Sequence, residues 1–207
     1  MARPVELPTV DALLKSLGSY AGRDKAIRTL YFLIQLHAQK SAKSKEWMVI
    51  AKQLSTTRMV LRQFNGLSQL KALSTLPGLS RILDKFDFTC VSTITVAYTI
   101  YWGVELLAWL SDARVLAYDS VRLFRYCLYL WLIAIVAGVL KQIREVCKKG
   151  LEKGRDELWT LVGLVCDGLS AVNMLPHKGF LWSGKFSTRQ QASFSLIASA
   201  IGWSKTL

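Results

Sequence analysis

Two long apolar runs in the second half of the chain constrain its fold more than any other feature of the sequence. They cover residues 88–110 and 123–140. An α-helix rises about 1.5 Å per residue, so runs of roughly 17–25 residues match the ~30 Å hydrocarbon core of a bilayer. The charged residue in each run, Glu105 in the first and Arg125 in the second, lies near one end of the run. Both runs are therefore candidate membrane spans.

Basic residues flank these runs and indicate how they cross. The chain carries 27 Lys and Arg against 14 Asp and Glu, and the segments before Phe88 and from Lys141 to Arg155 are both basic. The connection over 111–122 has no net charge. Because basic segments stay in the cytosol, the charges favour a hairpin with both flanks and the N-terminus on the cytosolic side. If only the second run crosses, the two basic regions lie on opposite sides.

Two further apolar segments follow. The segment over 158–175 has Asp167 at its centre, so it is either an interfacial helix with Asp167 facing water or a partner, or a span in which Asp167 lines a polar path. The segment over 187–205 is a shorter, third candidate span. Small residues recur on one of its sides, which allows close helix packing in lipid: Ser195, Ala198, Ser199 and Gly202.

The first half of the chain reads as amphipathic helices with basic outer faces, and strand signals are nearly absent. The sequence thus predicts an all-α integral membrane protein with a cytosolic or interfacial region over 1–87 and a membrane-associated region over 88–207. In the first region, Asp24 and Arg28 are spaced to form an i,i+4 ion pair on one helix.

A basic amphipathic helix over 54–76, ended by Pro77, is the most distinctive segment of this region. Its apolar side consists of Met59, Val60, Phe64, Leu67 and Leu70. Arg58 and Arg62 lie opposite, and Lys71 lies nearer the apolar side. Such a helix can lie among lipid headgroups, with the apolar side chains inserted and the three basic side chains at anionic phosphates. An ordinary surface helix of a soluble bundle shows the same pattern.

The residue types for catalysis or metal binding are sparse. Only His37 and His177 are present, neither at ligand spacing from a Cys or carboxylate, and the four cysteines are widely separated. No phosphate-binding glycine loop or nucleophile motif occurs. We expect no enzyme, cofactor or metal. A nucleic-acid partner is not expected either, because a basic nucleic-acid-binding domain would leave the apolar runs unexplained.

Four segments resemble, in order, the motifs of the peroxin eleven family, membrane proteins that elongate and proliferate peroxisomes. SYAGRDKAIRTLYFLIQL is similar to the first motif and LSTTRMVLRQF to the membrane-active helix. LAWLSDARVLAYDS is similar to the central motif and LVGLVCDGLSAVNMLPHKGFLWSGKF to the C-terminal one, which, with the short length, is most like the gamma subtype. The motif residues are Tyr20, Gly22, Arg23, Asp24, Asp112, Arg114, Asp167, Trp182 and Gly184. Gly66 departs from the family pattern, since glycine within a helix costs about 1 kcal/mol relative to Ala.

The resemblance implies a multi-pass peroxisomal membrane protein whose amphipathic helix inserts into the cytosolic leaflet and promotes curvature, elongation and division. It also implies homo-oligomers, hetero-oligomers with sister subtypes, and work with dynamin-type fission machinery through a tail-anchored adaptor. A pore for small solutes is the alternative, with Asp167 and Glu105 lining a conduit. A soluble basic helical binding module is the remaining alternative.

Overall fold

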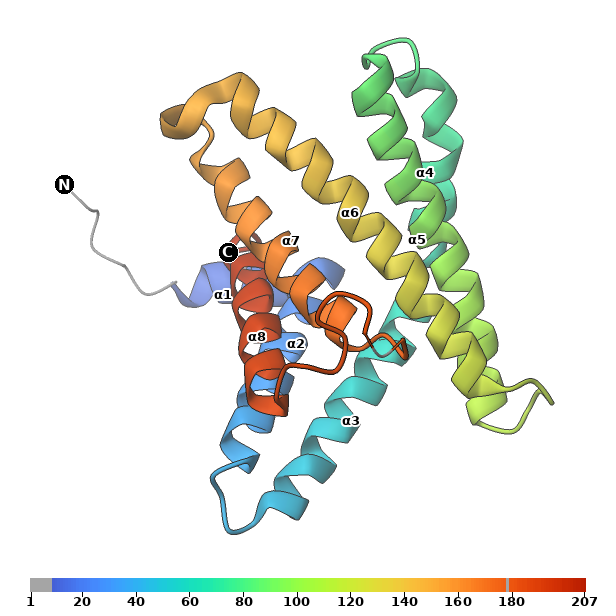
Figure 1. Ribbon diagram of the computed structural model, residues 1–207, viewed down its shortest axis with the longest axis vertical. Helices are drawn as coiled ribbons and strands as arrows, with labels where there is room; N and C mark the ends of the chain where they lie inside the picture. The colour runs from blue at the N-terminus through green and yellow to red at the C-terminus, as the bar shows by residue number, and fades with distance from the viewer. Residues whose placement is uncertain (1–8, 178) are drawn as a thin grey trace.

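The computed structural model describes residues 9–177 and 179–207, and the regular secondary structure within these residues is entirely helical. This confirms the predicted all-α class. The helices are α1 (Val10–Gly18), α2 (Tyr20–Ala38), α3 (Ser44–Gln63), α4 (Gly66–Leu79), α5 (Lys85–Asp112), α6 (Ser120–Lys153), α7 (Arg155–Asn173) and α8 (Thr188–Ser204) (Figure 1).

Polar side chains fix where most of these helices begin. In each case an oxygen of the residue before the helix accepts a hydrogen bond from a backbone N–H of the first turn, which would otherwise lack a partner. The capping residues are Thr9, Ser19, Asp84, Asp119 and Ser187. At α8 the side chain of Gln190 also accepts from the Ser187 backbone N–H, so α8 begins with a reciprocal capping box.

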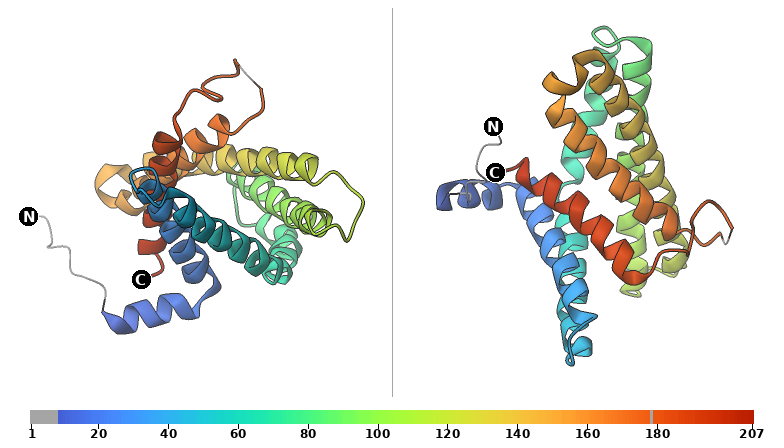
Figure 2. Two further views of the ribbon diagram at one scale, coloured as in Figure 1. Left: turned by 90° about the horizontal axis from the view of Figure 1, so that it is seen from below. Right: turned by 60° about the vertical axis from the view of Figure 1, so that its left-hand side comes forward.

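The helices close into a ring. α2 packs on α3, α5 on α6, α6 on α7, α7 on α8, and α8 returns to α2, while α3 touches α5. α1 and α4 lie outside this ring, against α2 and α5 respectively (Figures 1 and 2). Figure 2 shows the ring from two further directions. The predicted regions 1–87 and 88–207 therefore pack on each other, through α2 and α8 and through the contacts of α3 and α4 with α5.

Small side chains predominate at the most deeply buried positions of the bundle, and many large apolar side chains are exposed. The largest fully buried side chains are Ser16, Ser170 and Ser199, whereas Ile133, Val136 and Leu140 form an exposed stripe along α6. Soluble monomers rarely expose large contiguous apolar surfaces. Small residues at helix contacts are typical of bundles that pack in lipid. The distribution of side chains is thus that of a membrane-associated bundle.

Among the described residues, α5 and α6 are the helices long and apolar enough to cross a membrane. Their best 18-residue windows have mean hydropathies of 1.3 and 2.0, and they contain the predicted runs 88–110 and 123–140. The third predicted span, 187–205, coincides with α8, which has 17 residues. That α8 crosses the membrane stays a prediction.

The prediction of one continuous helix over 54–76 is wrong. α3 ends at Gln63, and α4 begins at Gly66 and continues past Pro77. The indole Nε1 of Trp102 in α5 donates a hydrogen bond to the backbone oxygen of Gln63 at 3.2 Å. The same indole fills the space that a Cβ at position 66 would occupy, 2.0 Å from its Cε2 atom. The break therefore lies where α5 meets the chain, and Gly66 permits that contact.

Candidate functional site

An exposed apolar face at the start of α4, which includes Phe64 of the break before it, is the first candidate site. The side chains of Phe64 and Leu67 are 81% and 78% exposed, and Leu70 is exposed beside them. Met59 and Val60 were expected on the same face but are half-buried on α3. The five residues are divided because the break at Phe64 separates the last turns of α3 from α4.

Polar contacts do little to hold α4 against the rest of the bundle. The hydroxyl groups of Ser68, Ser74 and Thr75 each donate to a backbone oxygen three residues earlier. Across the part of the chain that the structure describes, no ion pair joins α4 to another helix, and the Lys71 side chain is exposed. α4 packs along α5, and the Trp102 indole of α5 lies against Gly66 at the start of α4.

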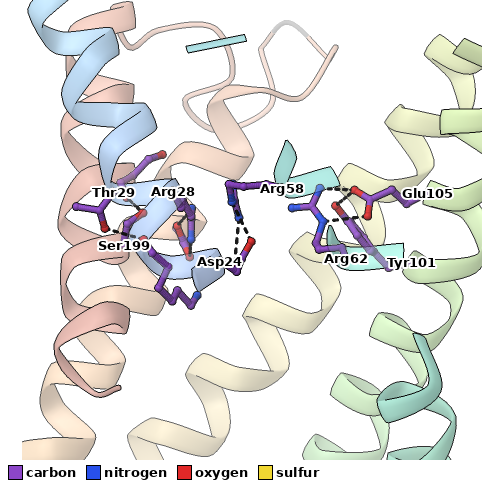
Figure 3. Close-up of polar contacts among 11 residues, drawn as sticks. Asp24, Arg28, Thr29, Arg58, Arg62, Tyr101, Glu105 and Ser199 are labelled. Carbon is purple, nitrogen blue, oxygen red and sulfur yellow. Dashed lines mark hydrogen bonds and ion pairs between the residues drawn. The ribbon is translucent and has the colours of Figure 1, made fainter. Parts of the chain in front are cut away.

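Arg58 and Arg62 of α3, expected at lipid phosphates, instead reach into the bundle. Arg58 Nε donates to Asp24 Oδ1 at 2.9 Å and its Nη2 to Asp24 Oδ2 at 3.2 Å. Arg62 Nε donates to Glu105 Oε2 at 2.9 Å. Figure 3 shows Arg58 turned toward Asp24 and Arg62 toward Glu105. In this arrangement carboxylates of neighbouring helices neutralise both guanidinium groups, and contact with lipid stays a prediction.

A third ion pair joins α2 to α7. Arg28 Nη1 donates to Asp167 Oδ2 at 3.1 Å, and its Nη2 pairs with Asp167 Oδ1. The predicted i,i+4 pair between Asp24 and Arg28 is therefore wrong, since each side chain finds its partner on another helix. The Arg28 guanidinium also lies 5.9 Å from the centre of the Trp131 ring on α6, within range for a cation–π contact.

Glu105 is the most deeply buried carboxylate of the three. It has 2% residual exposure, and Tyr101 Oη donates to its Oε1 at 2.9 Å in addition to the Arg62 contact. A charge buried this deeply is tolerated when it is paired and hydrogen-bonded, and removing one partner of such a pair costs about 3–5 kcal/mol. The ion pairs therefore fix α2, α3, α5 and α7 relative to one another.

These groups line a cavity of 820 Å³ inside the ring. Burial raises the pKa of the Asp24 carboxyl, but the Arg58 guanidinium beside it outweighs this and holds that pKa below its ordinary value. Burial, reinforced by Asp24, raises the pKa of the Tyr20 phenol to about 12. Burial and the nearby Arg28 lower the pKa of the Lys25 ammonium.

The motif residues serve two different purposes in the structure. Tyr20, Asp24 and Asp167 line the cavity. Gly22 instead allows α1 and α2 to meet closely, because a Cβ there would lie 2.0 Å from the backbone oxygen of Ser16. Arg23 is exposed.

The remaining motif residues shape turns. Trp182 Nε1 donates to the backbone oxygen of Leu169 at 2.9 Å, which holds the connection between α7 and α8 against α7. Gly184 has a φ of 70°, a left-handed conformation that glycine adopts without strain. Asp112 and Arg114 lie exposed at the end of α5, where Arg114 has a φ of 60°.

The small-residue face of α8 is buried within the chain. Ser195, Ala198 and Ser199 are almost fully buried, and Ser195 Oγ donates to Ser170 Oγ of α7 at 3.0 Å. A Cβ at Gly202 would lie 3.1 Å from Cδ and Cε of Lys25 on α2. This face therefore meets α2 and α7 of the same molecule.

The sequence did not identify the partners of the buried charges. Sequence reasoning assigned no role to Tyr101 and did not place Trp102 or Lys25 beside these charges, although all three line the cavity. A signal was present, since Glu105 and Asp167 are isolated acids in apolar segments and such acids need a partner. Which helix supplies that partner depends on tertiary packing.

The arrangement defines a class of protein: a membrane-associated, all-α bundle with apolar outer faces and an ion-paired interior. Within the described residues, no group of three or more His, Cys, Asp or Glu side chains could hold a metal ion. The chain belongs to the peroxisomal biogenesis factor 11 (PEX11) family, whose sequence model matches residues 10–157.

Two relatives indicate the subtype of the family to which the chain is most similar. The chain is 29% identical over 211 residues to human "Peroxisomal membrane protein 11C", covering 87% of each chain. It is 26% identical over 208 residues to the mouse protein of the same name, covering 86% of each chain. No solved structure matches the chain significantly. The predicted family and its gamma-like subtype are confirmed.

Proposed function

We propose that this chain is a peroxisomal membrane protein that promotes curvature, elongation and division of peroxisomes by inserting α4 into the cytosolic leaflet. Family membership supports the peroxisomal membrane and a part in peroxisome proliferation. The observation that carries the mechanism is the exposed apolar face formed by Leu67 and Leu70 of α4 together with Phe64 in the break before it. Exposed Lys71 on the same helix supplies a cation for anionic phosphates.

Shallow insertion requires α4 to leave its place beside α5. α4 lies lengthwise along α5 (Figure 1), whereas a leaflet wedge lies in the plane of the membrane. The break at Phe64 and Asn65 provides the hinge, and the described contacts of α4 to α5 include no ion pair that would have to separate. In this mechanism Arg58 and Arg62 anchor α3 in the bundle while α4 swings outward.

The bundle is the anchor in this proposal, with α5 and α6 as a hairpin whose basic flanks face the cytosol. Protease protection of intact peroxisomes tests this topology, because an N-terminal tag should be cleaved without lysis of the membrane. A protected tag would contradict it.

Self-association is assigned to outward-facing apolar side chains, because the small-residue face of α8 is occupied within the chain. The stripe of Ile133, Val136 and Leu140 on α6 is exposed and helically spaced. Energy transfer between labelled copies in vesicles should fall when Val136 is replaced by Lys. Unchanged transfer would place the contact elsewhere. Association with sister subtypes and with a fission adaptor is proposed from the family resemblance.

Tubulation of anionic vesicles by the reconstituted full-length chain tests the curvature function. The double variant Phe64→Glu, Leu67→Glu should lose tubulation, because charged side chains cannot enter the acyl region. The matched control is Val115→Glu, Tyr118→Glu, which adds the same charge at exposed positions in the α5–α6 connection. Equal tubulation by both double variants would refute the role of α4.

A solute pore is the second candidate, because Glu105 and Asp167 line one cavity. Each acidic side chain among the described lining residues is paired with an arginine, so none of the three is free to attract cations: Asp24, Glu105 and Asp167. Planar-bilayer conductance that disappears in Asp167→Asn would favour the pore, and silence of the purified chain would exclude it.

A further inference from the structure

The cavity inside the ring has the size and lining of a ligand site. Its 820 Å³ volume lies within the ~300–1,000 Å³ range of small-molecule pockets. Side chains from each of the helices α2 to α8 line it, including Gln69 of α4. It is therefore a feature of the assembled bundle, and its described lining does not include the exposed side chains of Phe64, Leu67 and Leu70.

The charges in the cavity do not cancel. Its lining contains the cations Lys25, Arg28, Arg58 and Arg62 and the anions Asp24, Glu105 and Asp167. Each arginine is bonded to one carboxylate, as described above. The lining thus leaves one positive charge over, and that charge belongs to Lys25.

Lys25 is half-buried and lies beside α8. Its aliphatic chain lies across Gly202 of α8, close enough that a Cβ there would be 3.1 Å from its Cδ and Cε atoms. Among the described residues its ammonium group forms neither an ion pair nor a hydrogen bond. Asp24 and Asp167 are each bonded to an arginine, so Lys25 is the cation of the described lining with which an entering anion can pair directly.

One part of the remaining lining is suited to a hydrocarbon chain, whereas another part is polar and includes Gln35, Thr56 and Gln191. Aromatic and apolar side chains from three helices face the cavity: Phe32, Tyr98, Tyr101, Trp102, Phe124, Leu128 and Trp131. Pockets that combine a mostly apolar wall with a few convergent polar groups are typical of sites for small amphiphiles.

We propose that this cavity binds one anionic amphiphile, whose negatively charged headgroup pairs with Lys25 and whose alkyl chain lies along the aromatic wall. The headgroup is a carboxylate or a phosphate. The occupant is either a free single-chain amphiphile or a phospholipid from the surrounding membrane. The inference goes beyond the curvature function and does not depend on insertion of α4.

Native mass spectrometry of the full-length chain in dodecyl maltoside tests the proposal with dodecyl phosphate as the probe. One molecule should bind saturably, and 1-dodecanol or inorganic phosphate alone should bind at least 10-fold more weakly. Lys25→Met should weaken dodecyl phosphate binding at least 10-fold. Lys40→Met, which removes an exposed cation in the turn after α2, should leave it unchanged.

The outcomes separate the alternatives. Dioleoylphosphatidate that binds with the same dependence on Lys25 identifies a membrane lipid as the occupant, whereas binding of dodecyl phosphate alone identifies a free amphiphile. Equal binding to wild type and Lys25→Met, or equal binding of 1-dodecanol, overturns the proposal. Lys25→Gln and a thermal scan of each variant verify that any loss of binding occurs in folded protein.

Discussion

Replacing Gly66 by Ala tests whether close approach of Trp102 causes the break between α3 and α4. The added Cβ would lie 2.0 Å from Cε2 and 2.1 Å from Cζ2 of the Trp102 indole, far inside van der Waals contact. The indole cannot move away without losing its hydrogen bond to the backbone oxygen of Gln63.

The expected cost follows from opposing contributions. Overpacking of this kind costs about 1–3 kcal/mol, and loss of the hydrogen bond adds about 1 kcal/mol. The higher helix propensity of alanine offsets up to about 1 kcal/mol of this destabilisation. The free energy of unfolding should therefore fall by about 1–3 kcal/mol, which for a chain of this size lowers the melting temperature by about 2–12 °C.

Thermal unfolding of the purified chain in dodecyl maltoside, followed by near-ultraviolet circular dichroism, measures this change. Gly103→Ala is the matched control, because it adds the same methyl group to α5 where nothing lies within 4 Å. Gly103→Ala should leave stability unchanged or raise it. Trp102→Phe removes the second ring, so it should restore part of the stability lost in Gly66→Ala. Equal melting temperatures for the two alanine variants would refute the packing argument.

Two further predictions concern the buried charges. Asp167→Asn leaves the Arg28 guanidinium buried without its counter-charge, so the free energy of unfolding should fall by about 3–5 kcal/mol, and the double variant with Arg28→Met should recover most of it in denaturant titrations. An unchanged midpoint for Asp167→Asn would contradict the buried pair. Because the pKa of Tyr20 is raised from 10.0 to about 12, the unfolded chain loses this proton first as pH rises, and the phenol's contribution to stability is lost between pH 10 and 12. Melting temperatures should drop more steeply across that window in wild type than in Tyr20→Phe, and parallel curves would count against the raised pKa.

The sequence was sufficient to predict the elements whose signal is local. The runs at 88–110 and 123–140 lie within α5 and α6, because length and apolarity alone define such helices. The order of the family motifs predicted the family, and the comparisons confirm it.

The break in the helix over 54–76 and the partners of the buried charges depend on tertiary contacts, so the sequence did not predict them. The periodicity over 54–76 is continuous, yet the helix breaks because the indole of Trp102, nearly forty residues further on, bonds to Gln63. Similarly, i,i+4 spacing pointed to an ion pair between Asp24 and Arg28, but a guanidinium from α3 and a carboxylate from α7 are better placed. The packing of the helices into a ring determines which buried charges lie close enough to pair.

The orientation of α4 in the bilayer tests the central proposal most directly. Spin labels at positions 67, 70 and 73, placed singly in the reconstituted, otherwise cysteine-free chain, report depth by their accessibility to oxygen and to a polar relaxing agent. An α4 that lies in the leaflet plane gives the same shallow depth, just below the phosphates, for all three labels. An α4 that stays lengthwise along α5 gives depths that differ by about 9 Å between positions 67 and 73, and this result would contradict the insertion mechanism.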